Sequence, residues 1–280
     1  MTCEERFDMK KGNLKNIRKY ILLYSGIAFI STLVIPSVLI NVIGYDNLSK
    51  YNIYISTFLQ FFLFFTTGTL ILWKKQEKIK FSIKYSLKMA PTIFCKGFVV
   101  FLTSRIAIDG IKWIYIGLTD DFSFINVEVG MDNYTFASAV VFLAAIPALC
   151  EELYYRVVAY SFLRHSNDAT IKILTTAIFC LAHIGAGGES MLSSLILGAV
   201  LIQCFISTQD YFSVVFMHFT FNFLALFFTY KVFWITDCAY ISSRAASGNE
   251  CLSWGLIYVA IAILLIAISL TIEMVTKKDR

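Results

Sequence analysis

The sequence predicts an all-α polytopic membrane protein, and its composition and apolar patterning both support this. Of the 280 residues, 58% are hydrophobic and only 15% are charged, against roughly 25% charged residues in an ordinary soluble domain. A helix needs about 20 apolar residues to cross a bilayer, so we expect about eight transmembrane helices. The apolar stretches lie at 20–43, 52–73, 91–117, 134–163, 171–185, 191–207, 211–230 and 252–273.

These stretches differ in length and polarity. The fifth, 171–185, is short for a full crossing, whereas the fourth, 134–163, is long enough to tilt or to extend beyond the bilayer. The third contains Lys96, Arg105 and Asp109. Because charges are costly against lipid, we expect that side of the third helix to face protein or water.

The distribution of basic residues predicts the orientation. With the N-terminus inside, most Lys and Arg residues fall in cytoplasmic segments, including both tails. Both termini are therefore predicted to be cytoplasmic. The net charge of +5 lies largely at membrane boundaries, which favours contact with anionic lipid and gives no reason to expect nucleic acid.

We divide the chain into four parts: a basic cytoplasmic tail at 1–19, N-terminal transmembrane helices at 20–130, a functional core at 131–230, and an external loop with the last helix at 231–280. The polar tail makes the first apolar stretch a retained span and not a cleaved signal. Abundant Lys, Ile, Phe, Tyr and Asn indicate an AT-rich genome, which favours a bacterial plasma membrane. Cys238 and Cys251 share the predicted external loop, where a disulfide is one alternative.

The fourth stretch contains two adjacent carboxylates and a guanidinium. Glu152 and Arg156 are four residues apart, on one helix face, and are expected to form an ion pair. Adjacent helix positions point about 100° apart, so Glu151 is expected to have a separate role. A carboxylate without a local partner suits a general base acting on water. Purely structural helix contacts remain the alternative.

Two further polar pairs occur at helical spacing. Phe179 and His183 lie four residues apart, so the aromatic ring is expected to pack beside the imidazole. His218 and Asn222 share the same spacing on a later span, where both side chains can donate to a developing oxyanion. The alternatives are a satisfied core histidine for the first pair and an interhelical hydrogen-bond pair for the second.

The three patterns fall at compatible depths. At a rise of about 1.5 Å per residue, Glu151 and His183 lie roughly 18 Å from the cytoplasmic ends of their helices, and His218 roughly 10 Å. We therefore expect one shared site, in a conical cavity open to the cytoplasmic side.

Taken in order, Glu151-Glu152-x-x-x-Arg156, Phe179-x-x-x-His183 and His218-x-x-x-Asn222 resemble the signature of the CPBP family. This family comprises CAAX proteases and bacteriocin-processing enzymes and is also called Abi. The resemblance covers about 150–222 and implies an intramembrane endopeptidase built as a bundle of eight spans.

By position, the resemblance implies that Glu151 and His183 activate a water and that His218 and Asn222 hold the oxyanion. Glu152 and Arg156 would support them, as would Phe179, which fixes the imidazole of its motif. The family has also been described as metal-dependent, and zinc on Glu151, His183 and His218 is an alternative. The chain lacks the His-Glu-x-x-His helix of zincins, so a metal-free mechanism is favoured.

The substrate expected from the resemblance is a membrane-associated peptide or lipidated protein. One alternative is a prenyl-CAAX endopeptidase that removes the C-terminal tripeptide. Another class is a non-catalytic bacteriocin-immunity or scaffold protein. A transporter is less favoured, because the symmetry-related broken helices typical of transporters are not evident in the sequence.

Overall fold

The computed structural model describes residues 14–24, 26–27, 30, 35–44, 54–75, 83–119, 135–184, 188–231 and 248–278. All secondary-structure elements in these ranges are helices, so the all-α prediction is confirmed for this part of the chain. The elements are α2 (Ile35–Ile43), η2 (Phe61–Thr66), α4 (Thr67–Lys75), α5 (Ile83–Thr119), α6 (Phe136–Ala139), η4 (Val140–Ala145), α7 (Ile146–Glu152), η5 (Leu153–Val158), α8 (Ala159–Leu163), α9 (Asp168–Ala182), α10 (Gly188–Thr208), α11 (Tyr211–Lys231) and α13 (Gly248–Lys278).

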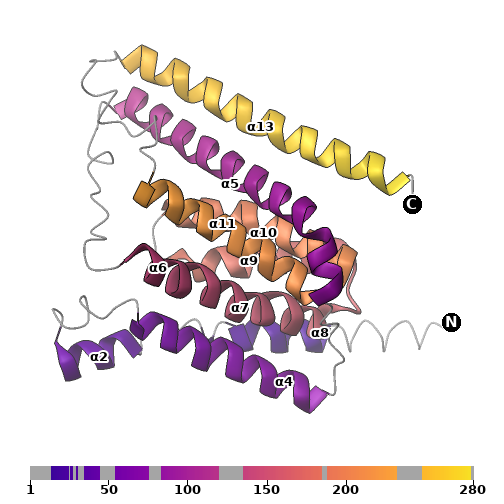
Figure 1. Cartoon of the computed structure of the whole chain (residues 1–280). Helices are drawn as coiled ribbons and strands as arrows, with labels where there is room; N and C mark the ends of the chain where they lie inside the picture. Colours follow the sequence, from indigo (N-terminus) through magenta and orange to yellow (C-terminus); the bar gives the residue numbers. More distant parts are fainter. Residues whose placement is uncertain are drawn as a thin grey trace.

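The helices form a bundle whose members run in broadly similar directions (Figure 1). On one side α13 lies along α5, and α5 in turn packs against α10 and α11. The next helix in the bundle runs from α6 to α8 and packs against α11. On the side away from α11 it is covered by α4. Thus α7 is covered by α11 on one face and by the helix 54–75 on another.

Six helices are long and apolar enough to cross a membrane: Tyr54–Lys75, Lys88–Thr119, Phe136–Leu163, Gly188–Thr208, Tyr211–Phe228 and Gly248–Ile268. The predicted stretch 20–43 lies partly outside the described residues. The stretch 171–185 forms α9, which has only 15 residues. Six of the eight predicted spans are therefore present, and the count of eight stays a prediction.

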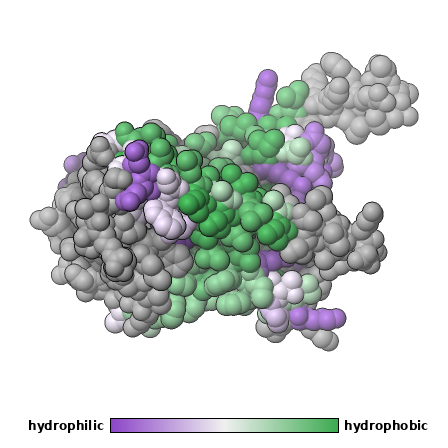
Figure 2. All heavy atoms as spheres, turned by 90° about the horizontal axis from the view of Figure 1, so that it is seen from above, coloured by the Kyte–Doolittle hydropathy of each residue, from purple (hydrophilic) through white to green (hydrophobic). Residues whose placement is uncertain are grey.

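The outer surface agrees with a membrane location. Viewed from above, hydrophobic residues cover the middle of the molecule and hydrophilic residues lie toward its two ends (Figure 2). Large apolar side chains stand exposed on several helices, among them Trp73, Leu118 and Ile263. In water such a surface would be costly, whereas in a bilayer it faces lipid.

The helix boundaries correct one expectation. Cys251 was predicted in a loop, but α13 begins at Gly248 and places this cysteine in its first turn. Its side chain is fully buried against Trp113 and Ile116. The first turn also contains the acidic Glu250, which is favourable beside a helix N-terminus. Cys238, the other cysteine of the disulfide considered as one alternative, lies outside the described residues.

Three π-helical runs adjoin α7: two flank it in the sequence and one packs against it. Within the described residues, η4 precedes α7, η5 follows it, and η2 belongs to the neighbouring helix 54–75. Such runs are rare in proteins and frequently occur at functional sites. The two glutamates thus stand at the end of a short α-helical segment between two wider turns.

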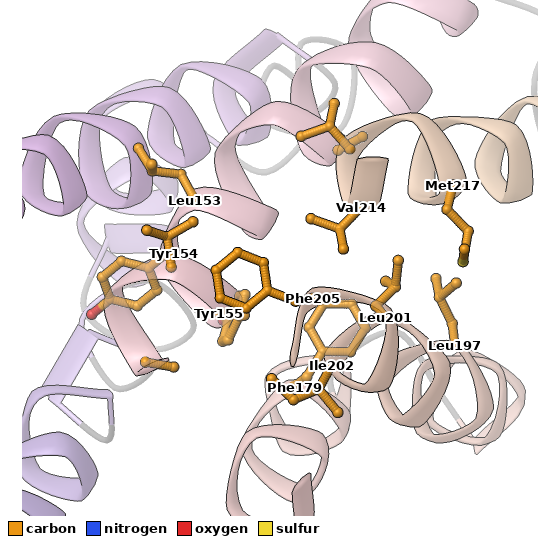
Figure 3. Close-up of a cluster of buried hydrophobic side chains, with 14 of the residues drawn as sticks. Leu153, Tyr154, Tyr155, Phe179, Leu197, Leu201, Ile202, Phe205, Val214 and Met217 are labelled. Carbon is orange, nitrogen blue, oxygen red and sulfur yellow. The ribbon is translucent and has the colours of Figure 1, made fainter. Parts of the chain in front are cut away.

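The main hydrophobic core supports this region. Tyr155 and Phe179 from two different helices meet the apolar faces of α10 and α11, where Leu201, Ile202 and Val214 are fully buried (Figure 3). Interiors packed in this way hold side chains in fixed rotamers. The polar residues described next are therefore attached to rigid elements.

Candidate active site

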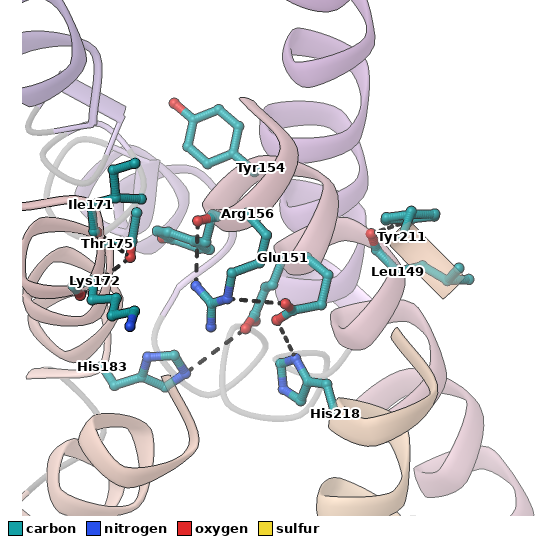
Figure 4. A network of polar contacts seen from close by, with 12 residues as sticks. Leu149, Glu151, Tyr154, Arg156, Ile171, Lys172, Thr175, His183, Tyr211 and His218 are labelled. Carbon is teal, nitrogen blue, oxygen red and sulfur yellow. Dashed lines mark hydrogen bonds and ion pairs between the residues drawn. The ribbon is translucent and has the colours of Figure 1, made fainter. Parts of the chain in front are cut away.

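The two adjacent glutamates of α7 face different partners, as their 100° separation predicts. Glu151 lies toward Gln60 and His183, whereas Glu152 lies toward Arg156 and His218. Both carboxylates are nearly inaccessible, with 6% of Glu151 and none of Glu152 exposed. Figure 4 shows the resulting network of polar contacts.

Glu152 connects a guanidinium to an imidazole. Its Oε2 lies 3.2 Å from Nε of Arg156, which confirms the predicted i, i+4 pair. Its Oε1 lies 2.8 Å from Nδ1 of His218. A carboxylate oxygen only accepts, so Nδ1 of His218 carries the hydrogen and Nε2 points to the other side of the ring. The carboxylate thereby fixes the orientation and tautomer of this histidine.

Glu151 has a looser environment. Its Oε1 accepts a hydrogen bond of 3.2 Å from Nε2 of Gln60. Its Oε2 lies 4.0 Å from Nε2 of His183, which is too long for a direct hydrogen bond. This oxygen is buried and has no hydrogen-bond partner among the described residues. A gap of that length between two polar atoms is suited to one bridging water.

His183 lies at the C-cap of α9, and not inside the helix as the sequence suggested. Its Nδ1 donates a hydrogen bond of 2.8 Å to the carbonyl oxygen of Phe179, one of the carbonyls left free at a helix end. That bond leaves the lone pair of Nε2 facing Glu151. The helix ends at Ala182, and His183 leaves the helical conformation with φ −99° and ψ 7°.

Phe179 is the centre of the site's aromatic packing. Its fully buried ring lies 4.7 Å from the ring of His183, as the spacing predicted, and 6.0 Å from that of His218. The guanidinium carbon of Arg156 sits 4.6 Å from the same ring, within the range of a cation–π interaction. One aromatic side chain therefore sets the spacing of three polar groups.

Gly198 allows this arrangement. A Cβ at this position of α10 would lie only 3.0 Å from the ring of Phe179. A larger residue would press against the ring that packs beside both histidines.

Asn222 lies one helical turn after His218 on α11, as predicted. Its Nδ2 donates a hydrogen bond of 3.4 Å to the carbonyl oxygen of Leu143 in η4. That bond is long, so the amide can exchange it for a stronger acceptor. In this arrangement the amide lies against η4.

Sequence reasoning missed Gln60. This residue lies outside every motif, in a helix that sequence reasoning left without a functional residue. A signal was present, because Gln60 is an amide inside an apolar run, and polar residues within a span mark functional sites. Tyr155 was also missed: its ring packs 5.2 Å from that of Phe179, and no sequence spacing relates the two.

The alternative zinc site would use Glu151, His183 and His218. Among the described residues, no three His, Cys, Asp or Glu side chains are grouped closely enough to hold a metal ion. Nδ1 of His183 bonds the carbonyl oxygen of Phe179 and Nδ1 of His218 bonds Glu152, so each ring keeps Nε2 for a further partner. The zinc alternative stays a prediction.

An apolar cavity of about 1280 Å³ lies beside α7. It is lined by Phe61, Phe65 and Trp73 of the helix 54–75, by Leu149 and Cys150 of α7, by Leu153 of η5, and by Tyr211 and Phe212 of α11. Leu149, Cys150 and Leu153 share one helix face, and Glu151 points to another side of the same helix. The predicted conical opening at the polar residues stays a prediction.

Comparison with known proteins gives one result that bears on function. Residues 133–224 match the family model described as type II CAAX prenyl endopeptidase Rce1-like. No curated protein matches the chain. No solved structure matches it either.

The matched segment contains all three motifs and all the elements from α7 to the middle of α11. Such a match implies a protease, and hence a peptide or protein substrate. The resemblance drawn from the motifs is confirmed: residues 133–224 carry the sequence pattern of the Rce1-like CAAX endopeptidases.

Proposed function

We propose that this protein is an intramembrane endopeptidase of the CAAX type, which hydrolyses a peptide bond in a membrane-associated substrate. One observation carries the proposal. Glu151 Oε2, buried and without a hydrogen-bond partner among the described residues, lies 4.0 Å from the unprotonated side of His183. This gap is a place for one water between two bases.

The reaction follows from that placement. Glu151 removes a proton from the water while its oxygen attacks the scissile carbonyl carbon. The carbonyl π electrons move to the oxygen and give a tetrahedral oxyanion. When the C–N bond breaks, the proton held by Glu151 passes to the leaving amine. His183 accepts a hydrogen bond from the water and fixes its direction.

The oxyanion would be held by the opposite side of the site. His218 offers Nε2, whose hydrogen is present when the ring is an imidazolium, and Glu152 compensates the charge of that form. Asn222 offers its amide once the long bond to Leu143 is exchanged. Donors aimed at a developing charge in a dry site are the largest contribution in many enzymes.

The apolar cavity supports a lipidated substrate. Its lining is dominated by aromatic and aliphatic side chains, and it adjoins the helix that bears Glu151. Lipid-binding cavities are mostly apolar with few polar groups. A prenylated C-terminal peptide would place its lipid in this cavity and its peptide bonds toward the polar network. An acylated peptide would need an apolar cavity in the same way.

The test is proteolysis by the purified protein in nanodiscs. Prenylated, acylated and unlipidated peptides of one sequence are incubated with the wild type and with Glu151→Gln, with and without a chelator. We expect cleavage of a lipidated peptide that survives chelation, with a loss of roughly 10²–10⁴-fold in Glu151→Gln.

Other outcomes would change the assignment. Cleavage lost on chelation and restored by zinc would replace the glutamate mechanism with a metal-dependent one. Full activity of Glu151→Gln would remove Glu151 from the chemistry. Binding of a peptide without cleavage would favour the non-catalytic class.

A further inference from the structure

Gln60 is the one polar group from the N-terminal helices that touches a motif carboxylate in the described structure. Its Nε2 donates to Glu151 Oε1 at 3.2 Å. The residue lies outside the segment 133–224 that matches the family model. Its contact with Glu151 therefore belongs to a part of the chain that the motifs do not describe.

The helix that carries Gln60 is anchored independently of the site. One turn earlier, Thr57 donates a hydrogen bond of 3.2 Å to the carbonyl oxygen of Phe142. A further turn back, the ring of Tyr54 packs edge-on against that of Phe142 at 5.1 Å. Tyr54, Thr57 and Gln60 share one face. These two contacts therefore hold the helix in place independently of the hydrogen bond between Gln60 and Glu151.

The side-chain amide of Gln60 is not explained by packing alone. Its Oε1 is buried and has no hydrogen-bond partner among the described residues. Leaving a buried acceptor unpaired is costly, so an amide selected for packing alone would be replaced by an apolar side chain. The hydrogen bond to Glu151 is what the amide supplies here.

The consequence concerns the rotamer of Glu151. Carboxylate oxygens can exchange by rotation of the terminal bond, which is broad and roughly two-fold. A donor on Oε1 fixes that rotation and leaves Oε2 toward His183. We propose that Gln60 is a positioning residue of the site: it holds one oxygen of Glu151 so that the other faces the water. This rests on the proposed function.

The experiment compares Gln60→Met with Thr57→Val. Both variants remove one hydrogen bond between the same helix and the α6–α7 region, but only the first removes the bond to Glu151. In Gln60→Met we expect kcat to fall by about 10- to 100-fold, typical of a lost supporting contact, with KM unchanged. In Thr57→Val we expect wild-type kcat. Thermal midpoints of the two variants should be similar.

A second variant guards against misfolding. Gln60→Asn keeps the amide but withdraws it by one methylene, so it should also lose kcat. Wild-type kcat in a folded Gln60→Met or Gln60→Asn protein would overturn the proposal. An equal loss of kcat in Thr57→Val would also overturn it, because the effect would then come from helix docking.

A spectroscopic measurement separates this inference from the proposed function. The infrared carboxylate band of Glu151, isolated by subtracting the spectrum of Glu151→Gln, should shift in Gln60→Met and stay in place in Thr57→Val. If the wild type cleaves nothing, the proposed function fails and the band alone decides on the contact. An unmoved band in Gln60→Met would overturn the inference even where cleavage is lost.

Discussion

Two helix interfaces in this molecule are built on opposite principles. Between α5 and α13, backbones approach so closely that a Cβ on Gly255 would lie 2.7 Å from the amide nitrogen of Ile114. Around α7, charged side chains meet instead, and Arg156 and Glu152 are both fully buried. Only 17% of the apolar stretch of α13 is buried inside the protein, against 56% of the corresponding stretch of α11.

The difference shows what each interface is for. Lipid is as apolar as a leucine side chain, so helices in a membrane associate through close packing or hydrogen bonds. The α5–α13 interface meets this need with close glycine contacts and with apolar packing of Trp113 and Ile116 against Cys251. Buried charges contribute little net stability compared with apolar residues of similar volume. Their presence around α7 therefore indicates chemistry, which the following predictions test.

The largest expected effect is on the stability of the charged interface. Arg156→Met would leave Glu152 buried beside His218 without its guanidinium, at a cost of about 3–5 kcal/mol. The measurement is the folded fraction in detergent, from thermal or denaturant unfolding. Adding Glu152→Gln to Arg156→Met should recover part of the loss. Wild-type stability of the single variant would refute a tight charge pair.

A catalytic effect of similar free energy is expected at Asn222. Asn222→Ala should lower kcat by roughly 10²–10³-fold if its amide holds an oxyanion. Substrate KM and thermal midpoint should stay close to those of the wild type. An unchanged kcat would leave Asn222 with only its structural bond to Leu143.

The glycine interface should respond in stability and not in turnover. Gly255→Ala places a methyl group against the backbone of α5, which cannot yield, and should destabilise by about 1–3 kcal/mol. The matched control is Gly188→Ala, where an added Cβ meets nothing within 4 Å. Per folded molecule, both variants should retain kcat. Equal stability of the two would show that α5 and α13 are not in close contact.

The smallest effect is expected at the periphery. Lys112 and Glu189 form an ion pair of 2.5 Å, but half of the Glu189 side chain is exposed. Solvent screening limits such pairs to about 0.2–1 kcal/mol. Glu189→Gln should therefore shift the unfolding midpoint slightly, and less at high salt. A loss as large as that of Gly255→Ala would contradict this ranking.

The contacts that could be predicted were local. Glu152–Arg156 and Phe179–His183 are four residues apart, so helix geometry alone brings them together. The bond between His218 and Glu152 joins residues 66 positions apart, and that between Gln60 and Glu151 joins residues 91 positions apart. No sequence period encodes such pairs, because they depend on how helices pack.

The helix count shows the same limit. Composition correctly identified the long apolar spans, and it flagged the short fifth stretch, which proved to be α9. It did not reveal that this helix ends at Ala182 with His183 as its cap. That detail depends on which carbonyl the imidazole bonds, and it decides which ring nitrogen faces Glu151.

The π-helical run η5 has a consequence for how this chain tolerates insertions and deletions. A π turn contains an additional residue relative to an α turn. Deleting one residue from 153–158 can therefore be absorbed by a change from a π turn to an α turn. Ser161, which accepts hydrogen bonds from Lys75 of α4, would then keep its direction. The same deletion inside the plain α-helix α9 would rotate the residues that follow by about 100°. The chain should thus tolerate a change of length at η5 better than in α9.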